Sequence, residues 1–264
     1  MHRFFVLPEL LKDTGATISL PRELAHQVRD VLRLAVGERL VLLDNSGNEI
    51  LAALQESGRS RVVVQLLERQ VGKNESPVRI ILCQGMLKSA RFEWILEKGT
   101  ESGVAVFAPT LCRRSMAGLE HAGPARIQRW QRIIREAAEQ SGRSRLPELL
   151  PVRPLVHALN AIPQDALAIM PWEEERNQPL RYVLNSTIGK KDTTSPALSD
   201  GSTAPSLTVV LFIGPEGGFM AEEVKHAQRY GVQVVTLGPR ILRAETAALA
   251  TIANVMYELE EPLA

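Results

Sequence analysis

One stretch, residues 207–259, alternates the patterns of buried strands with those of helices, and this alternation constrains the fold most. An unbroken apolar run over 207–213 precedes a glycine-rich turn, a helical segment over 221–230 and a second apolar run over 232–237. A second glycine turn leads into 244–259, where apolar residues recur at helical spacing. Short β-branched runs that are bounded by glycine and alternate with helices predict a parallel sheet buried on both faces.

Both glycine turns fall at the carboxyl ends of predicted strands, the edge at which open α/β sheets bind ligands. The first reads Gly214-Pro-Glu-Gly-Gly-Phe219 and the second Gly238-Pro-Arg-Ile-Leu-Arg243. Glycines leave the backbone uncovered, so a flat ligand can approach closely, and the prolines stiffen the loops. Neither turn has the glycine spacing of a dinucleotide fingerprint or the lysine of a P-loop. One such turn alone would favour an ordinary βα connection, but the pair, with two arginines in the second turn, indicates a ligand site.

Composition argues against several classes of protein. The 264 residues are 45% hydrophobic and 23% charged, and the net charge of +1 indicates no global polyanion-binding surface. Cys83 and Cys112 lie in strand-like contexts without Cys-x-x-Cys spacing, which argues against a zinc site or a disulfide framework and favours a reducing cytoplasm. No apolar stretch reaches membrane-spanning length. We therefore expect a cytoplasmic protein that has no bound metal and no membrane segment.

The first 72 residues predict a small β-rich domain, followed by a polar linker over 71–77. Strands are expected over 3–7, 39–43, 49–55 and 61–67, with a helix over 21–34 and a hairpin turn over 44–48. Short strands with polar turns favour a small barrel. The arginines of this domain are equally compatible with a solvated surface and with phosphate contacts, for which His2, Arg3 and Arg33 are favoured because they flank apolar runs.

The second predicted domain spans residues 73–264. Strands are expected over 78–84, 104–107 and 166–170, and helices over 88–99 and 124–141, in addition to the elements of 207–259. Arg113 and Arg114 follow a predicted strand and would face the ligand edge. Arg143 follows a helix stop at Gly142, where it could either meet the negative end of the helix or reach a substrate phosphate. Residues 185–206 are rich in Ser, Thr, Gly and Pro and predict a flexible insertion loop.

The two glycine turns, together with Glu245-Thr-Ala247, resemble the RsmE family, which comprises 16S rRNA (uridine-N3)-methyltransferases of the SPOUT superfamily. The similarity extends over nearly the whole chain, through Met1-His-Arg-Phe-Phe5, His26, Val31-Leu-Arg-Leu34, Lys88, Arg113-Arg-Ser115 and the stretch from Glu136 to Arg143. The chain departs from the family at Ser102, where a leucine is usual, and in the insertion-like residues 185–206. Neither departure touches the two turns.

This resemblance implies a fold, a reaction and a set of site residues. The expected fold is α/β, with an N-terminal PUA-like β-barrel that binds RNA and a C-terminal SPOUT domain with a deep trefoil knot. A homodimer is expected to bind S-adenosyl-L-methionine in the knot loops and to methylate N3 of a uridine near the 3′ end of 16S rRNA in the assembled small ribosomal subunit. The implied cofactor-binding residues are Met170, Pro171, Gly214, Glu216, Gly217, Gly218, Leu237, Gly238, Ile241, Leu242 and Arg243. The RNA-binding candidates are His2, Arg3, Arg33, Lys88, Arg113, Arg114 and Arg143.

Methylation of uridine N3 requires loss of its proton, so the site needs a base or a cation that stabilises the uridine anion. No histidine lies in the two turns, which leaves Arg143, Arg243 and Glu216 as the catalytic candidates. Either arginine could stabilise uridine O2 or O4, while Glu216 could orient the loop or a proton acceptor. For Glu216, capping of N–H groups at a helix start is the stronger alternative.

Two other functions remain open from the sequence. A non-catalytic RNA-binding ribosome-assembly factor would have the same fold, but the intact pair of glycine turns favours the methyltransferase. A dehydrogenase-like enzyme is disfavoured because the chain lacks G-x-G-x-x-G with an acidic residue about 20 positions further on. The alanine-rich segment 244–256 is compatible with a dimer contact as well as with a core helix.

Overall fold

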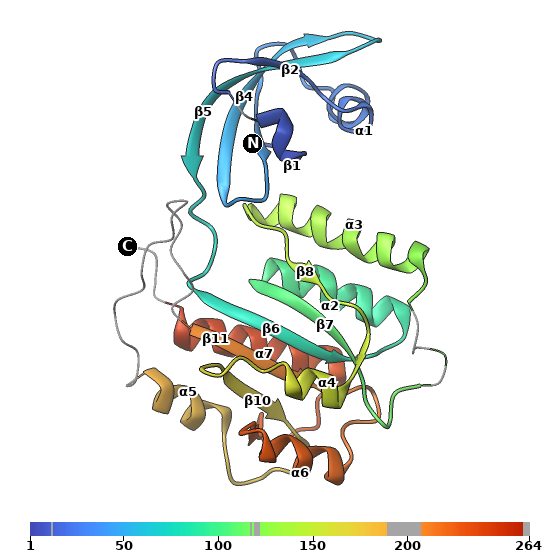
Figure 1. The fold of residues 1–264 in the computed structure, drawn as a ribbon, viewed down its shortest axis with the longest axis vertical. Helices are drawn as coiled ribbons and strands as arrows, with labels where there is room; N and C mark the ends of the chain where they lie inside the picture. The colour runs from blue at the N-terminus through green and yellow to red at the C-terminus, as the bar shows by residue number, and fades with distance from the viewer. Residues whose placement is uncertain (12, 117, 119–121, 189–206, 261–264) are drawn as a thin grey trace. The chain divides into compact units, whose positions relative to one another are not determined.

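The computed structural model describes residues 1–264 except 12, 117, 119–121, 189–206 and 261–264. The chain forms two compact units (Figure 1). The first unit comprises Met1–Glu75 and Ala138–Leu146, and the second comprises Ser76–Ala137 and Pro147–Ala264. The short return of the chain over 138–146 has no signal in the sequence pattern, because it depends on contacts between residues far apart in the chain.

The first unit is a five-stranded sheet with the order β1-β3-β4-β5-β2. The strands are β1 (Arg3–Phe5), β2 (Thr17–Ser19), β3 (Arg39–Leu43), β4 (Asn48–Ser57) and β5 (Val62–Val71), and the helical segments are η1 (Pro8–Leu11), α1 (Arg22–His26) and η2 (Gln27–Val31). Alternate residues of β3, β4 and β5, such as Leu40, Ile50 and Val64, are buried in one apolar core. This two-residue period is what places one face of each strand inward.

The turn between β3 and β4 forms as its composition predicts. The Asp44 carboxylate accepts a hydrogen bond from the backbone N–H of Ser46 at 3.0 Å. Asn45 and Gly47 adopt φ values of 65° and 98°, which Asn and Gly tolerate best. The predicted helix over 21–34 is shorter in the structure and is split into α1 and the π-helical η2, and Arg33 follows it with a φ of 54°.

The second unit is built on a parallel sheet with the strand order β12-β10-β11-β6-β7-β8, and β9 also pairs with β7. The strands are β6 (Val78–Gly85), β7 (Val104–Leu111), β8 (Glu148–Leu149), β9 (Arg153–Pro154), β10 (Leu167–Pro171), β11 (Leu207–Ile213) and β12 (Gln233–Val235). The helices are α2 (Ser89–Glu101), α3 (Pro124–Ser141), α4 (Leu155–Asn160), α5 (Leu180–Ile188), α6 (Ala221–Arg229) and α7 (Ala244–Leu259). All of the strand pairs in this sheet are parallel, as predicted.

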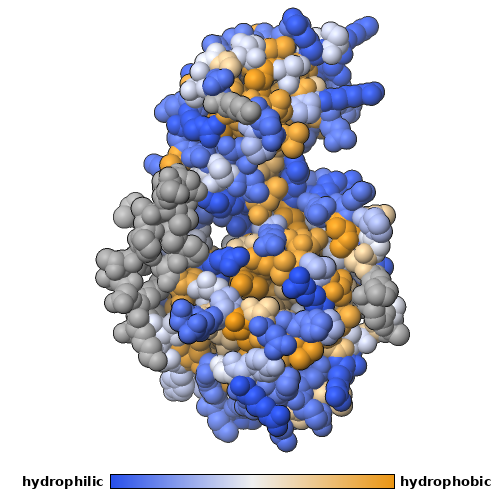
Figure 2. Space-filling model, in the orientation of Figure 1, coloured by the Kyte–Doolittle hydropathy of each residue, from blue (hydrophilic) through white to orange (hydrophobic). Residues whose placement is uncertain are grey.

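Helices cover both faces of the parallel sheet, which explains the unbroken apolar run of β11. Val209 and Leu211 pack into a core with α2, α5 and α7, whereas Val210 and Phe212 pack into a second core with α4 and α6. Phe212 is fully buried, so truncation to alanine would cost about 3–5 kcal/mol. Figure 2 shows the complementary outer surface, where hydrophilic side chains dominate the lower part of the view, over α6.

The strand order decides which loops meet. Strands β11 and β12 carry the two glycine turns, and β10 lies between them in the sheet. The loop that follows Pro171 therefore emerges at the same edge, between the two turns. This third loop is positioned by sheet order, which a local sequence pattern does not encode.

Several elements differ from the sequence predictions. Residues 185–188, expected to be part of a flexible loop, form the end of α5, because apolar residues such as Val183 and Leu184 pack into the core and extend the helix. The remainder of that expectation, 189–206, lies outside the described residues. Strands β2, β8 and β9 and helix α4 are short and were not predicted.

Candidate functional site

The carboxyl ends of β10, β11 and β12 surround a cavity of about 270 Å³. Its lining comes from residues within 171–176, 213–219 and 236–247, with Arg91 contributed by α2. The volume is near the lower end of the range for ligand pockets, roughly 300–1,000 Å³. The cavity lies where the two glycine turns predicted a ligand site.

Most of the expected cofactor-binding residues line this cavity. They are Pro171, Gly214, Glu216, Gly217, Gly218, Leu237, Gly238, Ile241, Leu242 and Arg243. Met170 is not part of the lining. Its side chain is fully buried in the apolar core beneath α4 and α6, because β-strand alternation turns it to the opposite side from Pro171.

The first glycine turn is held by close backbone packing. The N–H of Gly218 donates to the carbonyl of Pro215 at 2.9 Å, and Gly218 has a φ of 68°. A Cβ on Gly218 would collide with the carboxylate of Glu173. A Cβ on Gly85, at the end of β6, would lie 2.5 Å from the backbone nitrogen of Pro215. Gly85 is therefore a site residue that was missed from the sequence, where its only signal is a glycine that ends a strand.

A second set of contacts supports the same turn from outside the cavity. The buried carboxylate of Glu223 accepts hydrogen bonds from the backbone N–H of Arg113 and of Met220, both at 2.9 Å. The guanidinium of Arg114 donates to the carbonyl of Gly217 at 2.9 Å. Glu223 and Arg114 thus join the turn after β7 to the turn after β11. Glu223 was also missed from the sequence, because its role depends on residues 110 positions apart.

Glu216 lies at the beginning of α2. One of its carboxylate oxygens is 3.4 Å from the backbone nitrogen of Lys88, the N-cap residue of that helix, and 3.7 Å from the guanidinium of Arg91. Arg91 also lies 3.7 Å from the carboxylate of Glu245 in the first turn of α7. These contacts favour the capping and orienting interpretation of Glu216, although the helix involved is α2 and not the helix that follows Glu216 in sequence.

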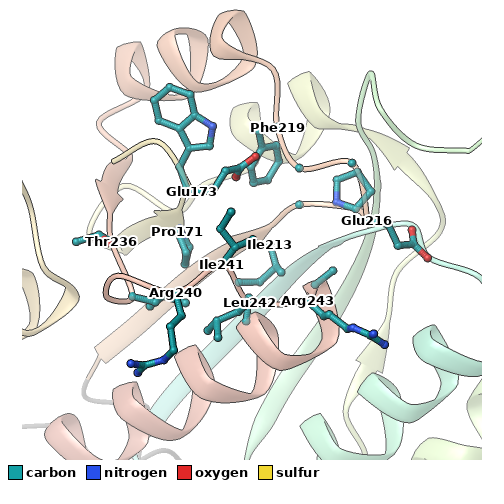
Figure 3. A pocket seen from close by; sticks show the side chains of 18 of the residues that line it. Pro171, Glu173, Ile213, Glu216, Phe219, Thr236, Arg240, Ile241, Leu242 and Arg243 are labelled. Carbon is teal, nitrogen blue, oxygen red and sulfur yellow. The ribbon is translucent and has the colours of Figure 1, made fainter. Parts of the chain in front are cut away.

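The second glycine turn is far more open. Gly238 has a φ of 111°, and a Cβ built on it would meet no atom within 4 Å. Ile241 is 81% exposed despite being apolar. Figure 3 shows the side chains of Arg240 and Arg243 extending to opposite sides of this turn. No ion pair of Arg243 is seen among the described residues, so its charge is available to a substrate.

One polar group of the cavity wall has no protein partner in the described part of the chain. The indole Nε1 of Trp172 is buried and lacks a hydrogen-bond acceptor. A buried N–H without a partner is costly. The uncovered backbone at Gly238 makes the cavity suited to a polar organic ligand.

Arg143, a catalytic and RNA-binding candidate, is not among the residues that line the cavity. It belongs to the first unit, is 6% exposed, and its guanidinium contacts the carboxylate of Glu75 at 2.9 Å. The other oxygen of Glu75 accepts the backbone N–H groups of Ser144 and Arg145. Glu75 therefore orients Arg143 within the first unit, and its catalytic and RNA-binding roles stay predictions.

The remaining RNA-binding candidates differ in their exposure and in their contacts with other residues. Arg3 pairs with the buried carboxylate of Glu49, which places its charge inside the first unit. Arg33 is exposed, and the His2 ring stacks on Phe4 at a centroid distance of 6.3 Å. In the second unit Lys88 and Arg113 are exposed, whereas Arg114 is exposed but is engaged with Gly217.

Other chemistry has little support in the described residues. Both cysteines are free and buried, and desolvation raises the pKa of Cys83 to about 12 and also raises that of Cys112, so neither thiol is an activated nucleophile at neutral pH. Across the described ranges, no cluster of three or more His, Cys, Asp or Glu side chains could hold a metal ion. In the same ranges, no helix is both long and apolar enough to span a membrane.

Two family models match the chain. The model of the RNA methyltransferase domain matches residues 74–256, and that of the RNA methyltransferase PUA domain matches residues 22–67. The first match contains all three loops that surround the cavity. The PUA match falls on the sheet of the first unit, in agreement with the expected PUA-like domain.

Curated relatives and solved structures resemble the chain over its whole length. Ribosomal RNA small subunit methyltransferase E of Bacillus subtilis is 30% identical over 98% of both chains, and that of Synechocystis is 32% identical over 98% of this chain and 78% of its own. A crystal structure of ribosomal RNA small subunit methyltransferase E from Neisseria gonorrhoeae, bound to S-adenosyl methionine, is 31% identical, with a TM-score of 0.83 over 98% of both chains. The chain belongs to the family of ribosomal RNA small subunit methyltransferase E.

Proposed function

We propose that this protein transfers a methyl group from S-adenosyl-L-methionine to N3 of a uridine near the 3′ end of 16S rRNA in the small ribosomal subunit. The observation that carries the proposal is the cavity at the carboxyl ends of β10, β11 and β12, whose walls include both glycine turns, with uncovered backbone at Gly238. The family of the chain and the S-adenosyl methionine bound in the Neisseria relative support the same cofactor here.

The cavity residues fit the parts of this cofactor. Leu237, Ile241 and Leu242 offer apolar surface to the adenine ring, and the backbone at Gly217 and Gly238 offers hydrogen-bonding groups without a charged partner. When bound, S-adenosylmethionine supplies an electrophilic methyl group on a sulfonium ion, so the main task of the protein is to hold donor and acceptor in line.

The residues of the second turn fit the needs of the acceptor. Uridine N3 must lose its proton to a base before the new N–C bond forms, and until that bond forms negative charge is spread over N3, O2 and O4. The exposed guanidinium of Arg243, at the cavity wall, is the side chain that can stabilise this charge. Glu216 holds the loop against α2 through Lys88 and Arg91. Replacement of Arg243 should therefore lower kcat and leave cofactor affinity nearly unchanged; an unchanged kcat would remove this role.

The two domains have separate roles, one in RNA binding and the other in methyl transfer. Residues 1–72 form the RNA-binding PUA-like domain, in which the exposed Arg33 and His2 contact phosphate or bases, and residues 73–264 form the methyltransferase domain. The exposed Lys88 and Arg113 extend the RNA contacts to the second domain. Arg33→Gln should weaken binding of 16S rRNA and leave S-adenosylmethionine binding unchanged, which filter binding and calorimetry would measure separately. Unchanged RNA affinity would contradict the role of Arg33.

The proposed enzyme is a cytoplasmic homodimer. The outer face of α7 supports dimer formation, since it carries small residues such as Ala253 and a tyrosine, Tyr257, that is 84% exposed. Light scattering of the purified protein should give twice the chain mass, and Tyr257→Glu should shift it toward the monomer. A monomeric wild-type protein would contradict this assignment. Location in the cytoplasm follows from the proposed substrate, and cell fractionation would test it.

A trefoil knot in the methyltransferase domain is part of the proposal. It is supported by the position of α7, which follows the edge strand β12 and yet packs against α2, α5 and β11. The connection over 236–243 must pass from the sheet edge to that helix layer. An experimental structure in which the 236–243 connection does not thread through a loop of the chain would contradict the knot.

The function is tested most simply with small ribosomal subunits from cells that lack the gene. Wild-type protein and S-adenosylmethionine should produce one methylated uridine in 16S rRNA, detected by mass spectrometry of nuclease fragments. Gly217→Val should abolish both cofactor binding and methylation. A protein that binds rRNA but neither binds the cofactor nor methylates would support the alternative, a non-catalytic ribosome-assembly factor.

A further inference from the structure

A second hollow lies on the outer side of the first glycine turn, between α4 and α6. It is a groove of about 570 Å³. Its apolar floor is made by Leu111, Pro154, Leu155 and Val156, and its rim carries Arg113, Lys225 and Arg229. In the part of the chain that the structure describes, none of these three cations is seen in an ion pair. The groove thus presents apolar surface between positively charged side chains.

The carboxylates beside the groove do not cancel this charge. Glu223 is buried, and its two oxygens accept backbone N–H groups, from Arg113 and Met220. Glu222 is exposed, and the three cations outnumber the two carboxylates of the lining. Lys225 and Arg229 are four residues apart on α6, so they lie on the same helix face.

The groove also has an aromatic edge. The ring of His226, which lines it, meets that of Tyr230 edge to face at a centroid distance of 5.2 Å, and Tyr230 is 38% exposed. Proteins that hold single-stranded nucleic acid combine cations along the backbone with apolar or aromatic surfaces on which bases stack. The groove has both cations and an apolar floor within one lining.

The groove and the cavity are connected through the loops that follow β7 and β11. Arg113 and Glu223 line the groove, and the same Glu223 holds Met220, while the adjacent Arg114 holds the carbonyl of Gly217 in the cavity wall. A strand bound in the groove would therefore lie against the loop that supports the proposed cofactor site. We propose that the groove binds single-stranded rRNA next to the target uridine, with phosphates on Arg113, Lys225 and Arg229 and a base on the apolar floor.

This inference rests on the proposed function, which names rRNA as the substrate, and its test must separate the two. The variant is Lys225→Gln with Arg229→Gln. The control is Arg132→Gln with Arg181→Gln, which removes the same charge from exposed sites on α3 and α5 of the same unit. Thermal unfolding and calorimetry with S-adenosylmethionine should give wild-type values for both double variants.

Binding of a single-stranded RNA oligonucleotide with the target sequence is then measured by fluorescence anisotropy, without cofactor, at several salt concentrations. The groove variant should bind about tenfold more weakly, and the slope of log K against log salt should fall by about 1.4, as expected for two lost single-strand phosphate contacts. In methylation assays its KM for RNA should rise with kcat unchanged. The control should match wild type in each assay.

Three results would overturn the inference. One is a groove variant that matches wild type in RNA affinity and salt slope. Another is an equal loss in the control, which would indicate a net-charge effect. The third is that the groove variant loses affinity for labelled poly-glutamate but not for RNA, which would indicate an acidic protein partner. Absence of methylation by the wild type would refute the proposed function instead, since the anisotropy measurement does not require catalysis.

Discussion

The two glycine turns that border the cavity lie at the same edge of the sheet but are held very differently. The first, over 214–219, is packed from both sides, because Gly85 lets it lie on β6 and Arg114 and Glu223 fix its outer side. The second, over 238–243, is open, and a Cβ on Gly238 would meet nothing within 4 Å. The comparison suggests that the first turn is formed before a ligand binds, whereas the second is arranged by the ligand.

The largest expected effect comes from the second turn. Arg243→Gln should lower kcat about 100-fold, because loss of one group that stabilises developing charge typically costs 10²–10³ in rate. Since Arg243 is exposed, the free energy of unfolding should change by less than about 0.5 kcal/mol. Single-turnover methylation and urea denaturation measure the two quantities. Arg240→Gln, in the same turn, is the matched control, and an equal rate loss in both variants would contradict a specific role for Arg243.

The next effect tests the packing of the first turn. Gly85→Ala would place a methyl group 2.5 Å from the Pro215 nitrogen, so the turn must shift. We expect a loss of about 1–3 kcal/mol in the free energy of unfolding and at least a tenfold weaker affinity for S-adenosylmethionine, measured by denaturation and calorimetry. Gly123→Ala is the control, because a Cβ at that position meets no atom within 4 Å. Wild-type affinity in Gly85→Ala would show that the turn is not preformed.

A smaller effect is expected at the outer support of the first turn. Glu223→Gln puts an amide N–H₂ where a carboxylate oxygen accepts a backbone N–H, so one hydrogen bond is lost. The free energy of unfolding should fall by about 1–3 kcal/mol, and cofactor affinity should fall several-fold. Glu222→Gln, at the neighbouring exposed position, should change neither. If both variants behave alike in thermal unfolding and calorimetry, the carboxylate of Glu223 does not support the turn.

The smallest effect separates binding from stability. Ile241→Ser should weaken cofactor affinity by a few-fold, because an apolar contact is lost only in the complex. It should leave the unfolding midpoint unchanged, since Ile241 is already 81% exposed in the free protein. Val36→Ser, at an exposed apolar position of the first unit, should alter neither quantity. A lower unfolding midpoint for Ile241→Ser would mean that the second turn is packed without ligand.

The contrast between the turns also explains what the sequence could predict. Strand β11 and helix α7 have the predicted bounds, because a continuous apolar run and a helical repeat are local signals. The two glycine turns were located for the same reason. Pro171 was implied by family resemblance, but Trp172 and Glu173 were missed, because only the placement of β10 between β11 and β12 brings their loop to the cavity.

Residues whose role depends on a distant partner were the least predictable. Gly85 matters because Pro215 packs on it, and Glu223 because it accepts the N–H of Arg113. The same limit applies to Arg143. Its position after a helix stop indicated either a helix-end contact or a substrate phosphate, whereas the structure pairs it with Glu75, 68 residues away.

Hydrogen–deuterium exchange of the whole protein, with and without S-adenosylmethionine, tests the central comparison most directly. We predict slow exchange of the amides of 216–220 in the free protein and little change on binding, because this turn is already packed. Amides of 237–243 should exchange rapidly in the free protein and become protected when the cofactor binds. Equal protection of both turns in the free protein, or no protection of 237–243 with the cofactor, would contradict the account.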